Sequence, residues 1–232
     1  MNTGKSKTLL DTYEPESVEA TEFRRLLHNV TRPIDGKSPS ALLVSSALVS
    51  EGKSTVASYL AITSACHGRK KTLLIDCDLR RPTIHKLFGL PIENGVADLV
   101  RGDSSGEGAY KQVSMKHLQL LTAGKVGSNP VELFGGQEII TVIEEAKFHF
   151  DLVIVDTAPV IPVSDPALLS QAVDGVILVV KAGSTPREVV KRACDILTKG
   201  QAKIVGIALN NAQGVLPYHY NYPYYRQYYS KK

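Results

Sequence analysis

Short aliphatic runs alternate along this chain with segments of helical periodicity, and this alternation constrains the fold more than any other feature. Strands that are aliphatic throughout are buried on both faces, and helices between them can cover both faces of one sheet. We therefore predict an α/β fold with a doubly wound, mostly parallel sheet and helices on both faces. The predicted strands are Ala41–Ser46, Thr72–Asp76, Leu118–Thr122, Leu152–Asp156, Gly175–Lys181 and Ile204–Leu209. The predicted helices are Pro15–Val30, Ser54–His67, Glu138–Phe148, Ser164–Gln171 and Pro186–Lys199.

Length and composition limit the class of protein. The 232 residues suffice for one α/β domain, which we assign to residues 1–216. A net charge of +4 is too small to indicate binding to nucleic acid, so we expect no such partner. No apolar run is long enough to span a membrane, and the N-terminus lacks the apolar core of a signal peptide. The widely spaced Cys66, Cys77 and Cys194 are typical of reduced thiols, which favours a cytoplasmic protein.

The segment between the first strand and the next helix has the spacing of a P-loop. Ala47 is followed after four residues by Gly52, Lys53 and Ser54, with alanine in place of the usual first glycine. Glycine lets the backbone approach phosphate oxygens, and successive N–H groups at a helix N-terminus face the anion. The lysine can neutralise the β and γ phosphates, and the serine hydroxyl can bind Mg²⁺. We therefore predict a P-loop NTPase-like domain with ATP and Mg²⁺ as ligands.

Three aspartates stand where such a site needs acidic groups. Asp76 ends the second predicted strand, Asp78 follows it, and Asp156 ends a later strand. In open parallel sheets the ligand lies beyond the carboxyl ends of the strands, so all three carboxylates should converge on the P-loop. A metal-bound triphosphate would relieve their mutual repulsion. The predicted nucleotide-binding residues are Ser50, Glu51, Gly52, Lys53, Ser54, Thr55 and Arg80. Arg80 either contacts phosphate or neutralises Asp76 or Asp78.

The C-terminus is rich in tyrosine. Seven of the chain's ten tyrosines lie close together: Tyr218, Tyr220, Tyr222, Tyr224, Tyr225, Tyr228 and Tyr229. We call residues 217–232 the tyrosine-rich tail and expect it to be flexible, because it has no aliphatic side chains to add to a core. Beside an ATP site, these phenols are candidate phosphoacceptors. The alternative interpretations are an aromatic docking strip and a sticky chain end with no specific partner.

These motifs, in this order, resemble the bacterial tyrosine kinases of capsule and exopolysaccharide synthesis (BY-kinases). That family has a Walker A loop, an Asp-x-Asp-x-Arg motif called Walker A′, a Walker B aspartate and a C-terminal tyrosine cluster. The matching segments here are Ala47–Ser54, Asp76–Arg80, Asp156 and the tyrosine-rich tail. The likeness also includes the N-terminal helix and the SNPVELF segment, Ser128–Phe134.

The resemblance implies an ATP-dependent protein-tyrosine kinase that phosphorylates its own tail in trans and regulates capsular or exopolysaccharide biosynthesis. It also implies a homo-oligomeric ring and a separate transmembrane modulator of the polysaccharide co-polymerase type. That modulator would hold a cytoplasmic kinase at the periphery of the plasma membrane. Enzymes of sugar-nucleotide metabolism are the protein substrates that the family suggests.

The N-terminal helix, placed at residues 17–31, departs from the family's oligomer motif, Glu-x2-Arg-x2-Arg. With Arg24 aligned on the central arginine, Thr21 stands where glutamate is expected and Leu27 where the last arginine is expected. Glu22 or Arg25 is a candidate to compensate. The ring contact is therefore left open by the sequence.

Phosphoryl transfer depends mainly on positioning and charge neutralisation, which suggests a role for each polar group. We expect Lys53 to hold the β and γ phosphates, Ser54 to bind Mg²⁺, and Asp78 and Asp156 to hold its waters. Asp76 either accepts the tyrosine proton or holds a metal-bound water. Two other functions are considered. A partitioning-type ATPase switch would have a second lysine where this chain has Leu48, and an ATP-binding module would have lost catalysis.

Overall fold

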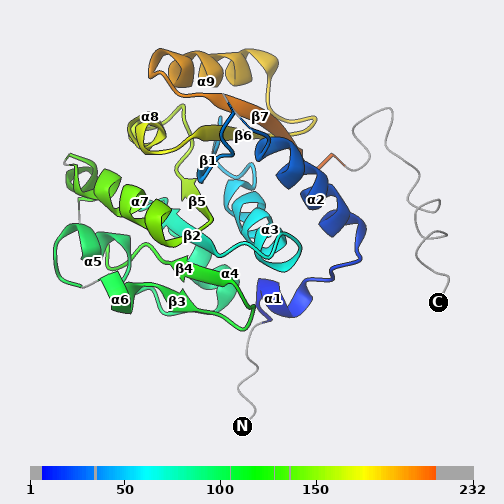
Figure 1. The fold of residues 1–232 in the computed structure, drawn as a ribbon. Helices are drawn as coiled ribbons and strands as arrows, with labels where there is room; N and C mark the ends of the chain where they lie inside the picture. Colours follow the sequence, from blue (N-terminus) through cyan, green and yellow to red (C-terminus); the bar gives the residue numbers. More distant parts are fainter. Residues whose placement is uncertain (1–6, 34–35, 105, 128, 136, 213–232) are drawn as a thin grey trace, which may run out of the picture.

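A single sheet forms the centre of the molecule (Figure 1). The computed structural model describes residues 7–33, 36–104, 106–127, 129–135 and 137–212. Within them the strand order is β3-β4-β2-β5-β1-β6-β7, and every pairing is parallel except the antiparallel pair β3–β4. The predicted α/β class is therefore confirmed. The strands are β1 (Ala41–Ser46), β2 (Thr72–Cys77), β3 (Lys111–Gln112), β4 (Leu118–Leu121), β5 (Leu152–Thr157), β6 (Gly175–Lys181) and β7 (Ile204–Asn210).

Helices connect the parallel strands. The α-helices are α1 (Leu9–Thr12), α2 (Val18–Val30), α3 (Lys53–Cys66), α4 (Ile84–Phe88), α5 (Val96–Val100), α6 (Gly106–Ala109), α7 (Glu138–His149), α8 (Asp165–Leu169) and α9 (Arg187–Lys199). The 3-10 helices are η1 (Pro130–Phe134) and η2 (Ser170–Ala172).

The sheet has an apolar core on each face, because successive strand residues point to opposite sides. On one face, Leu43 and Ile75 pack with apolar residues of α5, α7 and α9. On the other face, Leu42 and Leu74 pack with apolar residues of α2, α3 and α4. Figure 1 shows α2 and α3 on one side of the sheet and α7 on the other. This is the helix–sheet–helix layering that the aliphatic strands predict.

The N-terminal helix α2 is fastened to α3 by aromatic and polar contacts. The rings of Phe23 and Tyr59 stack with their centroids 4.8 Å apart. Arg24 donates to the Pro15 carbonyl at 2.8 Å, and its Nη1 lies 3.4 Å from His67 Nε2. The arginine that aligns with the centre of the family's oligomer motif therefore makes contacts within its own chain.

The predicted strands agree with the observed ones to within a residue at each end. β2, β5 and β7 each continue one residue further than expected, and β4 ends one residue earlier. The short elements β3, α1, α4, α5 and α6 were not predicted, because runs of two to five residues carry little periodicity. No helix within the described ranges combines the length and apolarity that crossing a membrane requires. The tyrosine-rich tail lies outside the described residues, so its predicted acceptor sites stay predictions.

Candidate nucleotide site at the edge of the sheet

The P-loop connects β1 to α3 and is braced from inside by Glu51. This side chain is 3 % exposed. Its carboxylate accepts the Leu48 N–H at 2.6 Å, the Lys181 N–H at 3.3 Å and the Thr185 hydroxyl. Glu51 thus ties the loop to the last residue of β6 and to the segment that follows this strand. Its side chain points into the protein, so only its backbone is placed to face a nucleotide.

Gly52 has a left-handed backbone conformation, with φ of +88°. A side chain there would overlap the amide nitrogen of Asn210, which donates to the Glu51 carbonyl at 2.9 Å. From the sequence we explained this glycine by the need of phosphate oxygens to approach the backbone. The structure adds two other reasons, which are the positive φ and the nearby end of β7.

Lys53 begins α3 and points toward the carboxylates. Its Nζ lies 2.7 Å from Asp78 Oδ2, 3.7 Å from Asp156 Oδ1 and 3.1 Å from the Ser54 hydroxyl. Burial by itself would lower the pKa of Lys53, but the nearby Asp156 and Asp78 outweigh it and the pKa is raised. The structure therefore brings four of the predicted site residues together, with the lysine charged.

Asp76 and Asp156 are neighbours on adjacent strands. They are register partners in the parallel pair β2–β5, so their side chains leave the same face of the sheet, and both are fully buried. Burial raises the pKa of Asp156 to about 6 against the attraction of Lys53. Burial and the adjacent Asp156 raise the pKa of Asp76 to about 8. Both Asp156 oxygens lack a hydrogen-bond partner among the described residues.

Asp76 differs from Asp156 in being held by the backbone. Its Oδ2 accepts the N–H groups of Thr83 and Ile84, both at 3.0 Å, and its Oδ1 accepts the Asp78 N–H at 3.2 Å. The carboxylate therefore anchors the loop that runs from β2 to α4. Its predicted role as a proton acceptor stays a prediction, since three of its acceptor sites are already occupied.

Arg80 makes its main contact with a residue that the sequence analysis did not include. Its Nε and Nη2 donate to the two oxygens of Asp165, at 2.9 and 3.2 Å. Asp165 opens α8, and its side chain is only 3 % exposed. Arg80 thus forms no ion pair with Asp76 or Asp78 among the described contacts, whereas we expected it to neutralise one of these two aspartates or to contact phosphate. The phosphate contact stays a prediction.

The donor set fits a metal-bound nucleotide. Ser54 and Asp78 are buried beside Lys53, whereas Ser50 and Thr55 are exposed at the mouth of the loop. The Asp156 oxygens, which lack a hydrogen-bond partner among the described residues, are the type of group that the waters of Mg²⁺ satisfy. In the part of the chain that the structure describes, no group of three His, Cys, Asp or Glu side chains could hold a metal alone. Mg²⁺ would therefore need phosphate and water as further ligands, which is its usual behaviour.

Sequence reasoning missed three residues of this site. Asn210 could have been found, because Asn210 and Asn211 follow the last predicted strand, at the carboxyl end where the ligand is expected. Asp165 also carries a signal, since Ser164-Asp165-Pro166 is a typical helix start. Nothing in the sequence pairs Thr185 with Glu51, because that contact depends on how β6 and the P-loop are placed.

Comparison with protein-family models gives one match over most of the chain. The model for ParA, described as "NUBPL iron-transfer P-loop NTPase", matches residues 39–224. That range begins just before β1 and includes the P-loop and all three aspartates.

Individual relatives are more specific. The chain is 35 % identical to "Tyrosine-protein kinase YwqD" of Bacillus subtilis, over 91 % of this chain and 88 % of that protein. It is 31 % identical to "Succinoglycan biosynthesis transport protein ExoP" of Rhizobium meliloti, over 84 % of this chain and 25 % of that protein. Among solved structures, the kinase domain of the Escherichia coli tyrosine kinase ETK is 28 % identical with a TM-score of 0.80. That match covers 93 % of this chain and 87 % of that one.

Proposed function

Because this chain belongs to the bacterial tyrosine-protein kinases and to the ParA family of P-loop NTPases, we propose that it transfers phosphate from ATP to tyrosines of a second copy's tail. The observation that carries this proposal is the cluster around Lys53. This lysine contacts Asp78. The buried carboxylate of Asp156 lies 3.7 Å from the same lysine and has no hydrogen-bond partner among the described residues. Buried carboxylate oxygens almost always accept hydrogen bonds, so a site built only for stability would supply donors here.

Each group of the cluster has a proposed task. Lys53 holds the β and γ phosphates, Ser54 would hold Mg²⁺, and Asp78 and Asp156 would hold its water ligands. The bound ion would neutralise charge on the phosphates. In the transfer, the bond from the γ-phosphorus to the bridging oxygen breaks, the phenol oxygen bonds to phosphorus, and ADP leaves. The phenolic proton passes to a carboxylate, for which Asp76 is our candidate, and the charge of bound Mg²⁺ would be needed to keep that carboxylate ionised.

The contacts of Lys53 suggest how this site changes on binding. In the structure Lys53 pairs with Asp78 at 2.7 Å. We propose that Lys53 exchanges this carboxylate for phosphate oxygens when the nucleotide arrives. Asp78 then becomes available to the metal's waters. The exchange keeps the lysine paired throughout, which avoids an uncompensated buried charge.

The remaining partners are proposed on the names of relatives. ExoP is called a succinoglycan biosynthesis transport protein, which supports a role in exopolysaccharide or capsule synthesis. We propose that a transmembrane modulator of the polysaccharide co-polymerase type holds this kinase at the plasma membrane. We propose enzymes of sugar-nucleotide metabolism as further substrates. Phosphotyrosine mapping in cells that make the polysaccharide tests this.

We also propose a homo-oligomer whose contacts include α2. Arg24 makes contacts within its own chain, so the exposed pair Glu22–Arg25, at 2.6 Å, is the better candidate for a contact between copies. Phosphorylated tails would carry several negative charges and be repelled by the site aspartates, which loosens the assembly. Sizing the protein before and after phosphatase treatment tests this, and an unchanged mass contradicts it.

A mixing experiment tests transfer between copies. The acceptor is Lys53→Met, which keeps its tail, and the donor is a variant with all seven tail tyrosines changed to phenylalanine. With Mg-ATP we expect phosphotyrosine on the Lys53→Met chain, located by mass spectrometry. Phosphate release without phosphotyrosine would instead indicate a switch ATPase. Neither product would indicate a nucleotide-binding module.

A further inference from the structure

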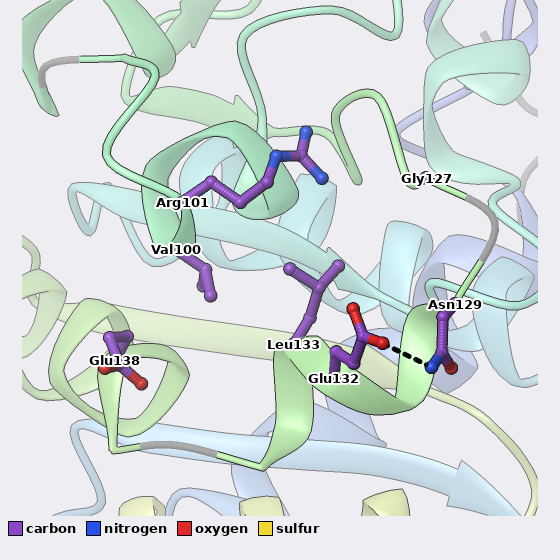
Figure 2. A pocket seen from close by; sticks show the side chains of 7 residues that line it. All are labelled: Val100, Arg101, Gly127, Asn129, Glu132, Leu133 and Glu138. Carbon is purple, nitrogen blue, oxygen red and sulfur yellow. Dashed lines mark hydrogen bonds between the residues drawn. The ribbon is translucent and has the colours of Figure 1, made fainter.

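A hollow lies outside the P-loop cluster (Figure 2). Its volume is about 500 Å³, and it lies between the end of α5, η1 and the start of α7. In Figure 2, Val100 and Leu133 occupy the middle of the hollow, with Arg101 on one side and Glu132 and Glu138 on the other. We call this hollow the α5–η1 pocket.

The α5–η1 pocket has an apolar floor and an acidic rim. Leu133 is buried and Val100 half-buried, whereas Glu132 and Glu138 are exposed. Glu132 accepts a hydrogen bond from the Asn129 amide at 2.7 Å. Neither glutamate takes part in an ion pair among the described residues.

Among the described residues that line the pocket, the one positive group is that of Arg101, and it is already neutralised. Arg101 pairs with Asp98 at 3.1 Å and with Asp103 at 3.0 Å, and it donates to the Lys125 carbonyl at 2.6 Å. The two glutamates therefore leave the pocket negative. An occupant should combine apolar or aromatic side chains with positive charge.

The pocket belongs to the same edge of the sheet as the nucleotide cluster. It is lined by the connection that leaves the carboxyl end of β4, and β4 is the neighbour of β2, whose end carries Asp76. The N–H groups of Val96 and Ala97 bond to the carbonyls of Thr122 and Ala123, at 2.8 and 2.9 Å, which fixes α5 beside this connection. The pocket and the aspartates therefore lie at the same edge of the sheet, on the connections that follow neighbouring strands.

We propose that the α5–η1 pocket docks the tyrosine-rich tail of a second copy of this chain, and this rests on the function proposed above. After Leu216 the tail contains Arg226, Lys231 and Lys232 and no acidic residue, which complements the two glutamates. Its tyrosine rings match the floor of Val100 and Leu133. A tail from another molecule can move along the pocket and present its phenols in turn, because its start is not fixed beside the same P-loop.

The same pocket would distinguish substrate from product. Each phosphotyrosine adds roughly 1.5 to 2 negative charges at neutral pH. A phosphorylated tail therefore meets Glu132 and Glu138 as like charges and leaves. The docking site thus favours tails that have not yet been modified.

Charge reversal tests the proposal with two acceptors of opposite charge. The enzyme is the full chain with Glu132→Lys and Glu138→Lys. One acceptor is the full-length Lys53→Met chain, and the other is an acidic copolymer of glutamate and tyrosine. For the tail acceptor we expect KM to rise about three- to tenfold with kcat little changed, since exposed charge pairs are weak. For the copolymer we expect KM to fall, because the repulsion has been replaced by attraction.

A matched control reverses the charge of two exposed acidic residues on α9, by Glu188→Lys and Asp195→Lys. It should leave the KM for the tail acceptor and the KM for the copolymer unchanged. Equal KM values for wild type and the pocket variant overturn the docking proposal. A rise for both acceptors also overturns it, because that result indicates damage to the site and not a charge-specific contact. If wild-type enzyme phosphorylates neither acceptor, the proposed function itself fails, which is a distinguishable outcome.

Discussion

The two halves of the nucleotide edge differ in how their polar groups are paired. In the P-loop half, the Glu51 carboxylate and the Asn210 amide both have partners, and they hold the loop from behind. In the carboxylate half, Asp156 has no hydrogen-bond partner among the described residues, and the pKa values of Asp76 and Asp156 are both raised. The loop is therefore shaped before the ligand arrives, whereas the acidic half is held at a cost to stability that a cation would relieve.

The largest expected effect comes from breaking the P-loop half. Glu51→Ala removes the acceptor for the Leu48 N–H, the Lys181 N–H and the Thr185 hydroxyl. Because each buried donor left unpaired costs about 1–3 kcal/mol, we expect a loss of about 3 kcal/mol or more in the free energy of unfolding. Urea denaturation measures it. The substitution Glu188→Ala, at an exposed position, is the control. If both variants change the free energy of unfolding by a similarly small amount, Glu51 does not hold the P-loop in place.

In the carboxylate half we expect a substitution to raise the free energy of unfolding instead of lowering it. Asp156→Asn removes a buried charge, so we expect the nucleotide-free protein to become more stable by up to about 3 kcal/mol, while transfer to tyrosine is lost. The folded pKa of Asp156 is about 6, above the ordinary 3.8. The cost of its charge is therefore small near pH 4 and fully present above about pH 7.

Thermal unfolding of wild type and Asp156→Asn at several pH values checks the sign. The gain in stability should grow as the pH rises from 4 to 7 and then level off. A variant that is less stable than wild type at pH 8 would contradict the account of this half. Asp174→Asn serves as the contrasting control, because hydrogen bonds from Ala41 and Ser40 outweigh burial and lower the pKa of Asp174.

A smaller loss of stability is expected from a substitution at Gly52, and it tests why the P-loop needs glycine there. Gly52→Ala forces a side chain into a positive-φ position and against Asn210, so we expect a loss of about 1–2 kcal/mol. Part of this loss should vanish in an Asn210→Ala background, where the overlap is absent. A double-mutant cycle measures the coupling. Strict additivity would show that the backbone conformation alone requires glycine.

The smallest effect is expected on kcat, from a substitution of Arg80, which connects the loop carrying Asp78 to Asp165 at the start of α8. Arg80→Lys keeps the charge but loses the two-pronged contact with Asp165, and the loop that carries Asp78 becomes less well held. We expect kcat to fall about two- to fivefold, with the KM for ATP nearly unchanged. Arg81→Lys is the matched control on the next, exposed residue. Equal kcat values for the two variants would remove Arg80 from the positioning of the site.

The amino-acid sequence was enough to predict six of the seven described strands, because strands buried on both faces must be aliphatic throughout, and β1 and β6 have the predicted bounds. It also placed Lys53, Asp78 and Asp156 together, since parallel strands deliver their carboxyl ends to one edge. The sequence was less informative for α4 and α5, because each helix has only five residues and so shows too little periodicity.

What the sequence determined by itself was the architecture and the chemistry at the strand ends, because both follow from local pattern and from the rules of parallel sheets. Only the tertiary structure decided the partners of the charged groups. Glu51 lies against Thr185, Arg80 against Asp165, and Asp76 against the start of α4. Such pairs depend on distances between elements far apart in the chain, which no local pattern encodes. The α5–η1 pocket is of the same kind, since Val100 and Leu133 become neighbours only when the connection after β4 folds over α5.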